Sequence, residues 1–529
     1  MFLSTQQARR GMVVAPHHLA AQAGLGVLRE GGNAVEAAIA TAAAIAVVYP
    51  HMNSIGGDNF WLISDGGPPL AIDACGPAAG AATIDRYSQL GREAIPARGA
   101  DAALTVSGAV GGWQTALKVA AQWGGNLPLA RLFQDAIGYA QDGFPATRSQ
   151  VNNTRAKRGE TENVPGFAGH FLADGDVPAE GETFAQPALA ATFEQLIDAG
   201  LDDYYRGDLA REIAKQLSTA GSPLTLADLK AYNALTVSPL AVALNAGMVH
   251  SLPPPTQGLA SLMILGLFER LGVTEGESFE HIHGLIECTK EAFRVRDAYV
   301  TDPAYMKMKP GDFLTKDYLD STAVVVDMTK AAPFGALAGD SDTVWFGAID
   351  GEGRAVSAIQ SLYWEFGSGL VLDGLGITWQ NRGASFSLDT NSVNPLTPGR
   401  RPFHTIHPSL ARLADGRLMV YGAMGGDGQP QSQAALFTRY VTYGQGLRDA
   451  IAAPRWLLGR TWGTVVTNLR IESRLDQRII ERLRAVGQDI EIVEPLTEVM
   501  GHAGAIVRHD SGLIEGASDP RSDGAAAGW

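Results

Sequence analysis

A threonine at the start of a β-type segment is the residue best placed to act as a nucleophile. Thr343 follows the segment 335–342, which is rich in small residues, and opens the apolar run 343–349. If the chain were cut before Thr343, this residue would carry a hydroxyl and a free α-amino group, and would be nucleophile and base in one. The same spacing is typical of a threonine that opens a strand after a surface loop. The rest of the sequence must decide between the two.

A predicted hairpin brings a second hydroxyl group to this threonine. The segment 350–354 contains two glycines and separates the apolar runs 343–349 and 355–361, which is typical of a β-hairpin. Pairing across this turn places Ser361 opposite Thr343, with Cβ atoms about 4.5–5.5 Å apart. A slip of one residue would turn the side chains to the other face of the sheet and separate the two hydroxyls.

Size and composition exclude several classes of protein. The 529 residues suffice for two or three domains or for one large interleaved domain, and 46% are hydrophobic, which is ample for a core. The net charge of −15 and the lack of a basic run indicate no binding to nucleic acid. Cys75 and Cys288 form neither a disulfide framework nor a zinc knuckle, so we expect two buried, small apolar side chains.

No segment is expected to enter a membrane. The most apolar run, 34–48, contains Glu36 and ends before Pro50, so it is too short to span a bilayer. The N-terminal residues 1–10 lack the apolar core of a secretory signal. We therefore expect a cytoplasmic protein.

The pattern along the chain predicts mixed helices and strands. Asn33 and Glu36 form a capping-box arrangement at the start of a buried helix over 34–48. Further predicted elements are a glycine turn and strand within 54–63, mainly helices over 117–299, a helix over 259–271 after the kink at 253–255, and strands and hairpins from 343 onward.

The histidines do not predict a metal site. His281 and His283 are two residues apart in a helical pattern and point to different faces, and His404 and His407 flank a stretch that reads as extended. There is also no nucleophile elbow, P-loop or dinucleotide-binding motif. We expect neither a metal nor an organic cofactor.

Six short motifs lie along the chain, at 31–38, 56–60, 253–255, 366–369, 425–426 and 516–521. In order and spacing they resemble those of the γ-glutamyltranspeptidase family of N-terminal nucleophile hydrolases. The resemblance implies an αββα sandwich of the α+β class, made as one precursor and cut before Thr343. The large subunit 1–342 and the small subunit 343–529 would then be each other's partners in one interleaved domain, with a homo-oligomer of such heterodimers left open.

The resemblance also implies catalytic roles. The hydroxyl of Thr343 would attack the preceding carbonyl group, and the α-amino group released by this cleavage would then serve as the base. Ser361 falls where the family has a second hydroxyl beside the nucleophile. Gly425 and Gly426 fall on the family's glycine pair, whose backbone N–H groups form the oxyanion hole.

Two departures concern the groups that hold an amino acid substrate in this family. The acidic residue that binds the substrate's ammonium group corresponds to Ser385, which carries no charge to offset an ammonium. The arginine of the large subunit that binds its carboxylate corresponds to Ile84, with Arg86 two residues further on. Both changes argue against γ-glutamyl substrates.

Further departures add a cation and bulk. Arg382 stands where the family has a glutamine, His404 and Thr405 replace a serine pair, and Tyr363 replaces an asparagine. The planar donor fork of an arginine suits a carboxylate. We therefore expect Arg382 to hold a small acid, with Ser385, His404, Thr405 and Tyr363 as its other contacts and with Arg86 or His404 as alternative clamps.

These features together resemble the oxamate amidohydrolase branch of the family, which splits oxamate into oxalate and ammonia in purine ureide breakdown. The runs 49–53 and 361–369 support this branch. Two alternatives stay open. One is a hydrolase or acylase of the same family that acts on γ-glutamyl or glutaryl amides. The other is an unprocessed homologue that binds a metabolite or a partner without catalysis.

Overall fold

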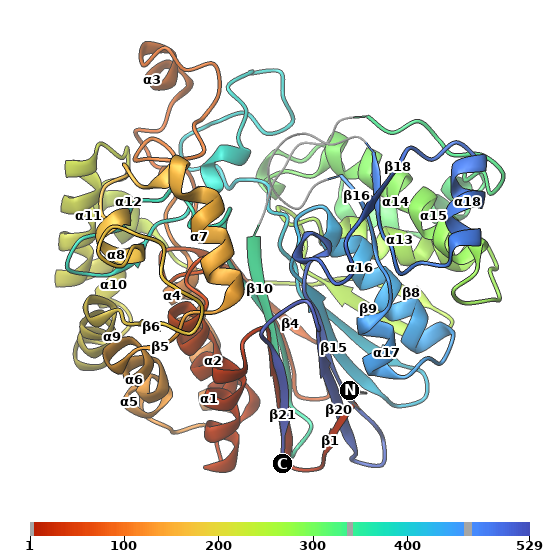
Figure 1. The fold of residues 1–529 in the computed structure, drawn as a ribbon, viewed down its shortest axis with the longest axis horizontal. Helices are drawn as coiled ribbons and strands as arrows, with labels where there is room; N and C mark the ends of the chain where they lie inside the picture. Colours follow the sequence, from red (N-terminus) through yellow and green to blue (C-terminus); the bar gives the residue numbers. More distant parts are fainter. Residues whose placement is uncertain (1–4, 336–341, 460–467) are drawn as a thin grey trace.

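Two seven-stranded sheets lie face to face between two layers of helices in the computed structural model (Figure 1), which describes residues 5–335, 342–459 and 468–529. Neighbouring strands are antiparallel in both sheets. The first sheet has the order β21 (Ala525–Gly528), β2 (Gly11–Ala15), β10 (Asp342–Asp350), β11 (Ala355–Tyr363), β3 (Asp58–Ser64), β4 (Leu70–Ala74) and β7 (Leu235–Val237). The second has the order β1 (Gln6–Ala8), β20 (Ile514–Ser518), β19 (Ala503–Arg508), β15 (Leu418–Ala423), β14 (Ser409–Leu413), β9 (Gly247–Ser251) and β8 (Leu240–Leu244).

Helices cover the outer face of each sheet. The first sheet packs against α1 (His18–Arg29), α2 (Ala34–Val48) and α4 (Ala109–Gln122), and the second against α13 (Gly258–Arg270) and α16 (Gly428–Phe437), with α14 (Phe279–Tyr299) packed on both of these. The predicted αββα sandwich of the α+β class is confirmed.

Smaller elements surround these layers. Helices are α3 (Ile84–Gln89), α5 (Leu129–Leu132), α6 (Gln134–Asp142), α7 (Arg148–Thr161), α8 (Phe167–Phe171), α9 (Pro187–Ala199), α10 (Asp203–Arg206), α11 (Asp208–Ala220), α12 (Leu226–Ala231), α15 (Lys316–Ala323), α17 (Leu447–Ala452) and α18 (Gln477–Ala485). Short helical turns are η1 (Pro303–Tyr305), η2 (Pro310–Leu314), η3 (Arg382–Ser385), η4 (Thr438–Thr442) and η5 (Glu498–Met500). Small sheets pair β5 (Phe144–Pro145) with β6 (Thr183–Phe184), β12 (Val371–Leu372) with β13 (Ile377–Thr378), and β16 (Trp456–Leu458) with β17 (Leu469–Glu472) and β18 (Ile490–Val493).

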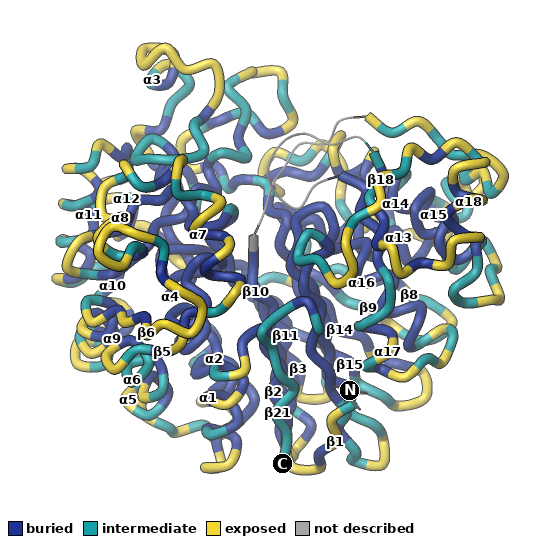
Figure 2. Tube along the Cα trace, viewed as in Figure 1, coloured by how far each residue is buried: buried dark blue, intermediate teal, exposed yellow. Residues whose placement is uncertain are grey.

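Apolar side chains fill the spaces between the four layers, and Figure 2 shows the central strands as buried. Trp345 and Ile359 of the first sheet pack with Val420 and Ile506 of the second. Trp345 belongs to β10 and Ile359 to β11, so the hairpin that begins at Thr343 packs directly against the second sheet.

Both sheets combine strands from before and after position 343. Strand β10 pairs with β2 on one side and with β11 on the other, and β11 pairs with β3. In the second sheet, β14 pairs with β9 and with β15. Each sheet therefore contains strands from both halves of the chain.

The structure confirms the buried helix and corrects part of the pattern. Asn33 accepts hydrogen bonds from the N–H groups of Val35 and Glu36, and Glu36 accepts from Asn33, so the capping box of α2 is formed. Helices dominate 117–299 as expected, but β5 to β9 also lie in this range. A short apolar run such as Leu240–Leu244 fits a strand that pairs with a neighbour as well as it fits a helix. Within the described ranges, no helix is long and apolar enough to cross a bilayer.

Candidate active site

The two hydroxyl groups predicted to meet do so at the start of the β10–β11 hairpin. The Thr343 hydroxyl donates to Oγ of Ser361 at 3.3 Å, and both residues are buried. Ser361 Oγ also accepts from the backbone N–H of Tyr363 at 2.8 Å. The second contact fixes the rotamer of Ser361, so its hydroxyl stays directed at Thr343.

The hairpin register is the predicted one up to the last pair. Val344 lies opposite Gln360, as expected, but the register shifts between Asp342 and Val344, so that Asp342 pairs with Tyr363. Two residues of β11 thus face Thr343, which is a β-bulge, a feature that re-aims side chains at sheet ends. Tyr363 has a φ of 86°, a left-handed conformation that is unusual for an aromatic residue.

Arg382 supplies a buried positive charge beside this hairpin. Its guanidinium lies over the Tyr363 ring at 3.7 Å, and its Nη1 donates to Thr405 Oγ1 at 3.4 Å. Its Nη2 is buried and has no hydrogen-bond partner in the part of the chain that the structure describes. Burial lowers the pKa of Arg382 to about 10, against the opposing influence of Tyr363 and Asp58, so the group stays charged at neutral pH. Among the described residues, only the Tyr363 side chain therefore separates the Arg382 cation, with its unpaired Nη2, from the hydroxyl pair.

His404 reaches the same region but brings no charge. It is fully buried, and its Nε2 lies 3.0 Å from Cys75 Sγ and 3.3 Å from Asp58 Oδ2. Burial, together with Arg382 and Arg401, holds the pKa of His404 well below its usual range. A neutral imidazole has one donor and one acceptor nitrogen but no charge to hold a carboxylate, so the role of His404 as an alternative clamp stays a prediction.

Arg86, the other alternative clamp, lies elsewhere. Its side chain contacts the Asp101 carboxylate and donates to the carbonyl of Gly221. It belongs to α3, which projects at the edge of the molecule, far from the start of β10 (Figure 1). Thr83 caps α3 by accepting a hydrogen bond from the backbone N–H of Arg86, and Ile84 is the first residue of that helix.

The glycine pair forms the turn between β15 and α16. Gly425 and Gly426 have φ values of 125° and 54°, which favour glycine. Gln257 donates to the carbonyl of Gly426 at 2.8 Å and to that of Thr405 at 2.6 Å. Among the described residues, no acceptor is found for the N–H groups of the pair. Gln257 thus links this turn to Thr405, which accepts a hydrogen bond from Arg382. The N–H groups of both glycines remain available as donors within the described residues.

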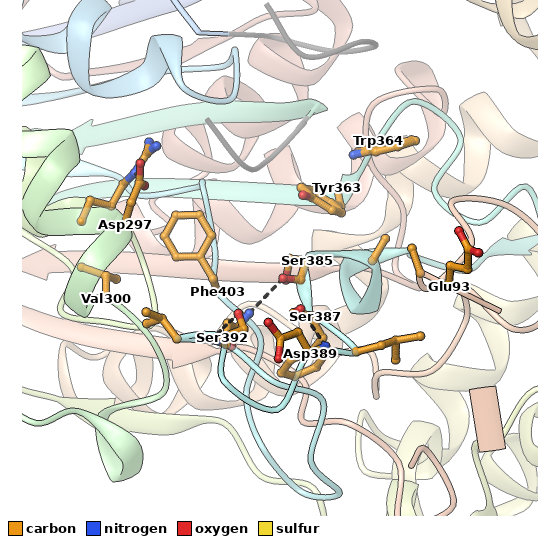
Figure 3. Close-up of a pocket in the computed structure, with 17 residues that line it drawn as sticks. Glu93, Asp297, Val300, Tyr363, Trp364, Ser385, Ser387, Asp389, Ser392 and Phe403 are labelled. Atoms are coloured by element: carbon orange, nitrogen blue, oxygen red, sulfur yellow. Dashed lines mark hydrogen bonds and ion pairs between the residues drawn. The ribbon is translucent and has the colours of Figure 1, made fainter. Parts of the chain in front are cut away.

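An open cavity of about 510 Å³ lies beside this cluster (Figure 3). Tyr363 and Trp364 line one side, and Ser385 and Phe403 lie across from them. Neither Thr343 nor Arg382 is among the lining residues. Tyr363 therefore forms the wall between the cavity and the buried hydroxyl pair.

Sequence reasoning missed the roles of Asp58 and Cys75, which the fold brings to this place. Asp58 Oδ1 accepts from Gln380 Nε2 at 3.1 Å, and burial raises the pKa of Asp58 to about 8. Cys75, expected to be a buried, small apolar residue, is buried and also makes a polar contact with His404. Asp58 lies in the glycine-rich motif 56–60, but nothing in the local sequence pairs it with positions 75 and 404.

Comparison with known proteins places this arrangement in a family. The family model described as gamma-glutamyltranspeptidase matches residues 20–529. The chain belongs to this family. It is 52% identical to the oxamate amidohydrolase proenzyme of Klebsiella pneumoniae subsp. pneumoniae over 99% of this chain and 100% of that protein. It is 40% identical to the glutathione hydrolase-like YwrD proenzyme of Bacillus subtilis, over 98% of each chain.

A solved structure shows the same fold. The crystal structure of cephalosporin acylase from Bacillus halodurans superposes with a TM-score of 0.91 at 32% identity, covering 100% of this chain and 97% of that one. The sandwich is therefore of the N-terminal nucleophile hydrolase type. The chain is an enzyme of this family, an amidohydrolase similar to oxamate amidohydrolase.

Proposed function

We propose that this chain is a proenzyme that cuts itself before Thr343 and then hydrolyses oxamate to oxalate and ammonia. The observation that carries the proposal is the buried Thr343–Ser361 hydroxyl pair with the charged guanidinium of Arg382 one side chain away. The identity of 52% to an oxamate amidohydrolase proenzyme supports the substrate.

Maturation takes place at the start of β10, opposite the left-handed Tyr363 at the end of β11. Oγ1 of Thr343 attacks the carbonyl carbon of Asp342, the acyl group moves from nitrogen to oxygen, and water hydrolyses the resulting ester. Ser361 accepts the hydrogen bond of the attacking hydroxyl and holds it in place. The products are residues 1–342 and residues 343–529. Because each sheet contains hydrogen-bonded strands from both pieces, the two subunits stay together after the cut.

Hydrolysis then uses the new N-terminus. An α-amino group has a pKa of about 7.7–8.0, so it is partly neutral near pH 7–8 and takes the proton of the Thr343 hydroxyl. The oxygen attacks the carboxamide carbon, and the N–H groups of Gly425 and Gly426 stabilise the oxyanion. Ammonia leaves with the proton held by the amine, and water releases oxalate from the oxalyl ester.

Arg382 supports a carboxylate next to the reacting carbon. In oxamate the carboxylate and the carboxamide are directly bonded, so a cation must lie close to the nucleophile. The unused Nη2 of Arg382 suits this task, and Thr405 orients the guanidinium through Nη1. Ser385 and Tyr363 complete this side of the site, and neither offers the negative charge that an α-ammonium group would need.

Asp58, whose charge acts on Arg382, does not replace the missing ammonium-binding residue. Asp58 is fully buried, and burial raises its pKa to about 8, so much of it is uncharged at neutral pH. Its Oδ1 is already occupied by Gly76, Gly108 and Gln380. A substrate without an amino group therefore fits better than a γ-glutamyl compound.

An alternative substrate class is a larger γ-glutamyl or glutaryl amide. The cavity of about 510 Å³ behind Tyr363 favours it, because movement of this ring would join the cavity to the nucleophile. The relatives named glutathione hydrolase and cephalosporin acylase belong to the same family.

One comparison separates the two classes. Purified, processed protein is incubated with oxamate, succinamate, glutaramate and glutathione, and release of ammonia or glutamate is measured. The proposal expects the highest kcat/KM for oxamate. Higher kcat/KM for glutaramate or glutathione would establish the alternative, and a processed protein inactive on all four would refute both.

A further inference from the structure

Three side chains with metal-binding atoms lie close together near Arg382. Asp58 begins β3, Cys75 follows β4, and His404 precedes β14. The Asp58 carboxylate, the Cys75 thiol and the His404 imidazole are each buried, and their ligand atoms all lie within 4.8 Å of one another. No step of the proposed hydrolysis uses this group.

The arrangement differs from that of a proton relay. In a nucleophile–histidine–acid relay, the acid contacts one ring nitrogen and the nucleophile contacts the other. Here Cys75 Sγ and Asp58 Oδ2 lie 3.0 Å and 3.3 Å from the same atom, Nε2 of His404. Three ligand atoms that converge on a common point are the geometry of an ion site.

Hydrogen bonds hold one oxygen of the Asp58 carboxylate, and the other oxygen has no hydrogen-bond donor among the described residues. Its Oδ1 accepts from the N–H groups of Gly76 at 3.1 Å and Gly108 at 2.9 Å, and from Gln380 Nε2 at 3.1 Å. Its Oδ2 is buried and makes no hydrogen bond within the described ranges, although it lies close to His404. Outer-shell donors that fix one carboxylate oxygen while the other faces an imidazole and a thiol are typical of a ligand to a metal.

We propose that Asp58, Cys75 and His404 bind one Zn²⁺ ion. A thiolate, an imidazole nitrogen and a carboxylate oxygen are the three ligand types that zinc uses, at about 2.0–2.3 Å. In a tetrahedral site such ligands lie about 3.3–3.6 Å apart, so the Sγ–Nε2 contact needs to widen by about half an ångström. Three protein ligands leave one position for water or another small ligand.

The charges balance within the site. When zinc binds, the thiol proton of Cys75 and any proton on the Asp58 carboxyl group leave to solvent, and lone pairs of the sulfur and of Oδ2 form the bonds to zinc. The thiolate and the carboxylate together offset the two positive charges of the ion. Arg382 then faces a neutral cluster, so its positive charge does not exclude the metal. None of the three ligands belongs to β11, so binding of zinc does not require a change in the backbone of Tyr363.

The test measures metal content and needs no activity. Processed protein is stripped with a chelator, loaded with ZnCl₂ or CoCl₂, desalted and analysed by mass spectrometry for metal. We expect about one ion per chain, and with Co²⁺ a thiolate-to-metal charge-transfer band in the near ultraviolet. Cys75→Ser removes this band and weakens Zn²⁺ binding by more than the roughly 10- to 100-fold that loss of an outer-shell partner costs.

Matched controls keep the result interpretable. Cys288→Ser removes the other buried cysteine, which lies in α14, and we expect it to bind metal like the wild type. Asp58→Asn is nearly isosteric and tests the site if Cys75→Ser fails to fold. Substoichiometric zinc in the wild type, or equal affinity in Cys75→Ser and wild type, would overturn the zinc site and leave the oxamate proposal untouched.

Discussion

Replacing Arg382 by methionine removes the buried cation while keeping a side chain of similar length. Two unit charges about 4 Å apart interact with about 4 kcal/mol at an effective dielectric constant of about 20. Loss of one partner of a buried charge pair costs about 2–5 kcal/mol. Since each ~1.36 kcal/mol is a factor of ten, kcat/KM for oxamate should fall roughly 30- to 5,000-fold.

The assay follows ammonia release from oxamate by the processed variant. Arg382→Lys keeps the charge but loses the planar fork, so it should recover only part of the activity. Arg86→Met is the matched control, because Arg86 contacts Asp101 and the Gly221 carbonyl at the edge of the molecule. It should leave kcat/KM for oxamate unchanged.

Processing reports whether the Arg382 variant is folded. If Arg382→Met is cut normally and hydrolyses oxamate with wild-type kcat/KM, Arg382 does not bind the carboxylate. If Arg86→Met shows the larger loss instead, the structural argument for the position of the clamp is refuted.

Three further outcomes follow from the described contacts. Thr343→Ala should run as a single uncut chain in denaturing electrophoresis, and cleavage of this variant at the same bond would exclude Thr343 as nucleophile. Ser361→Ala loses the contact that holds the Thr343 hydroxyl, so it should slow processing, ammonia release or both by roughly tenfold or more; wild-type rates in both assays would show that the contact has no catalytic role. Arg455 and Arg521 hold the pKa of the buried Asp519 at about 2 against the opposing effect of burial. Because the pKa is lower in the folded than in the unfolded state, the ionised Asp519 stabilises the fold at neutral pH, and this stabilisation is lost as the pH falls from about 4 to 2. Denaturant titrations should therefore show the unfolding free energy falling by about 2 kcal/mol over this range. The same pH dependence of the unfolding free energy in Asp519→Asn would contradict this.

Local patterns predicted the elements that depend on neighbours in sequence. The cap of α2 needs only Asn33 and Glu36, and the β10–β11 register follows from the turn between them. The hydroxyl pair could therefore be predicted. The bulge at Thr343 could not, because it depends on the left-handed backbone of Tyr363 and on its contact with Arg382.

No local sequence pattern predicts contacts between segments that are far apart in the chain. Positions 58, 75 and 404 meet only because β3, β4 and the segment before β14 lie side by side in the sandwich. For the same reason, the choice between Arg86 and Arg382 required the fold. Both are arginines at plausible positions in sequence, but only Arg382 is buried next to the hairpin.

Mass spectrometry of the small subunit tests the central claim most directly. Processed protein is mixed with oxamate, quenched in acid and digested, and the peptide that begins at position 343 is analysed. The account predicts an N-terminus at Thr343 and, during turnover, an oxalyl group on that residue. A different new N-terminus, or an oxalyl group on another residue, would contradict it.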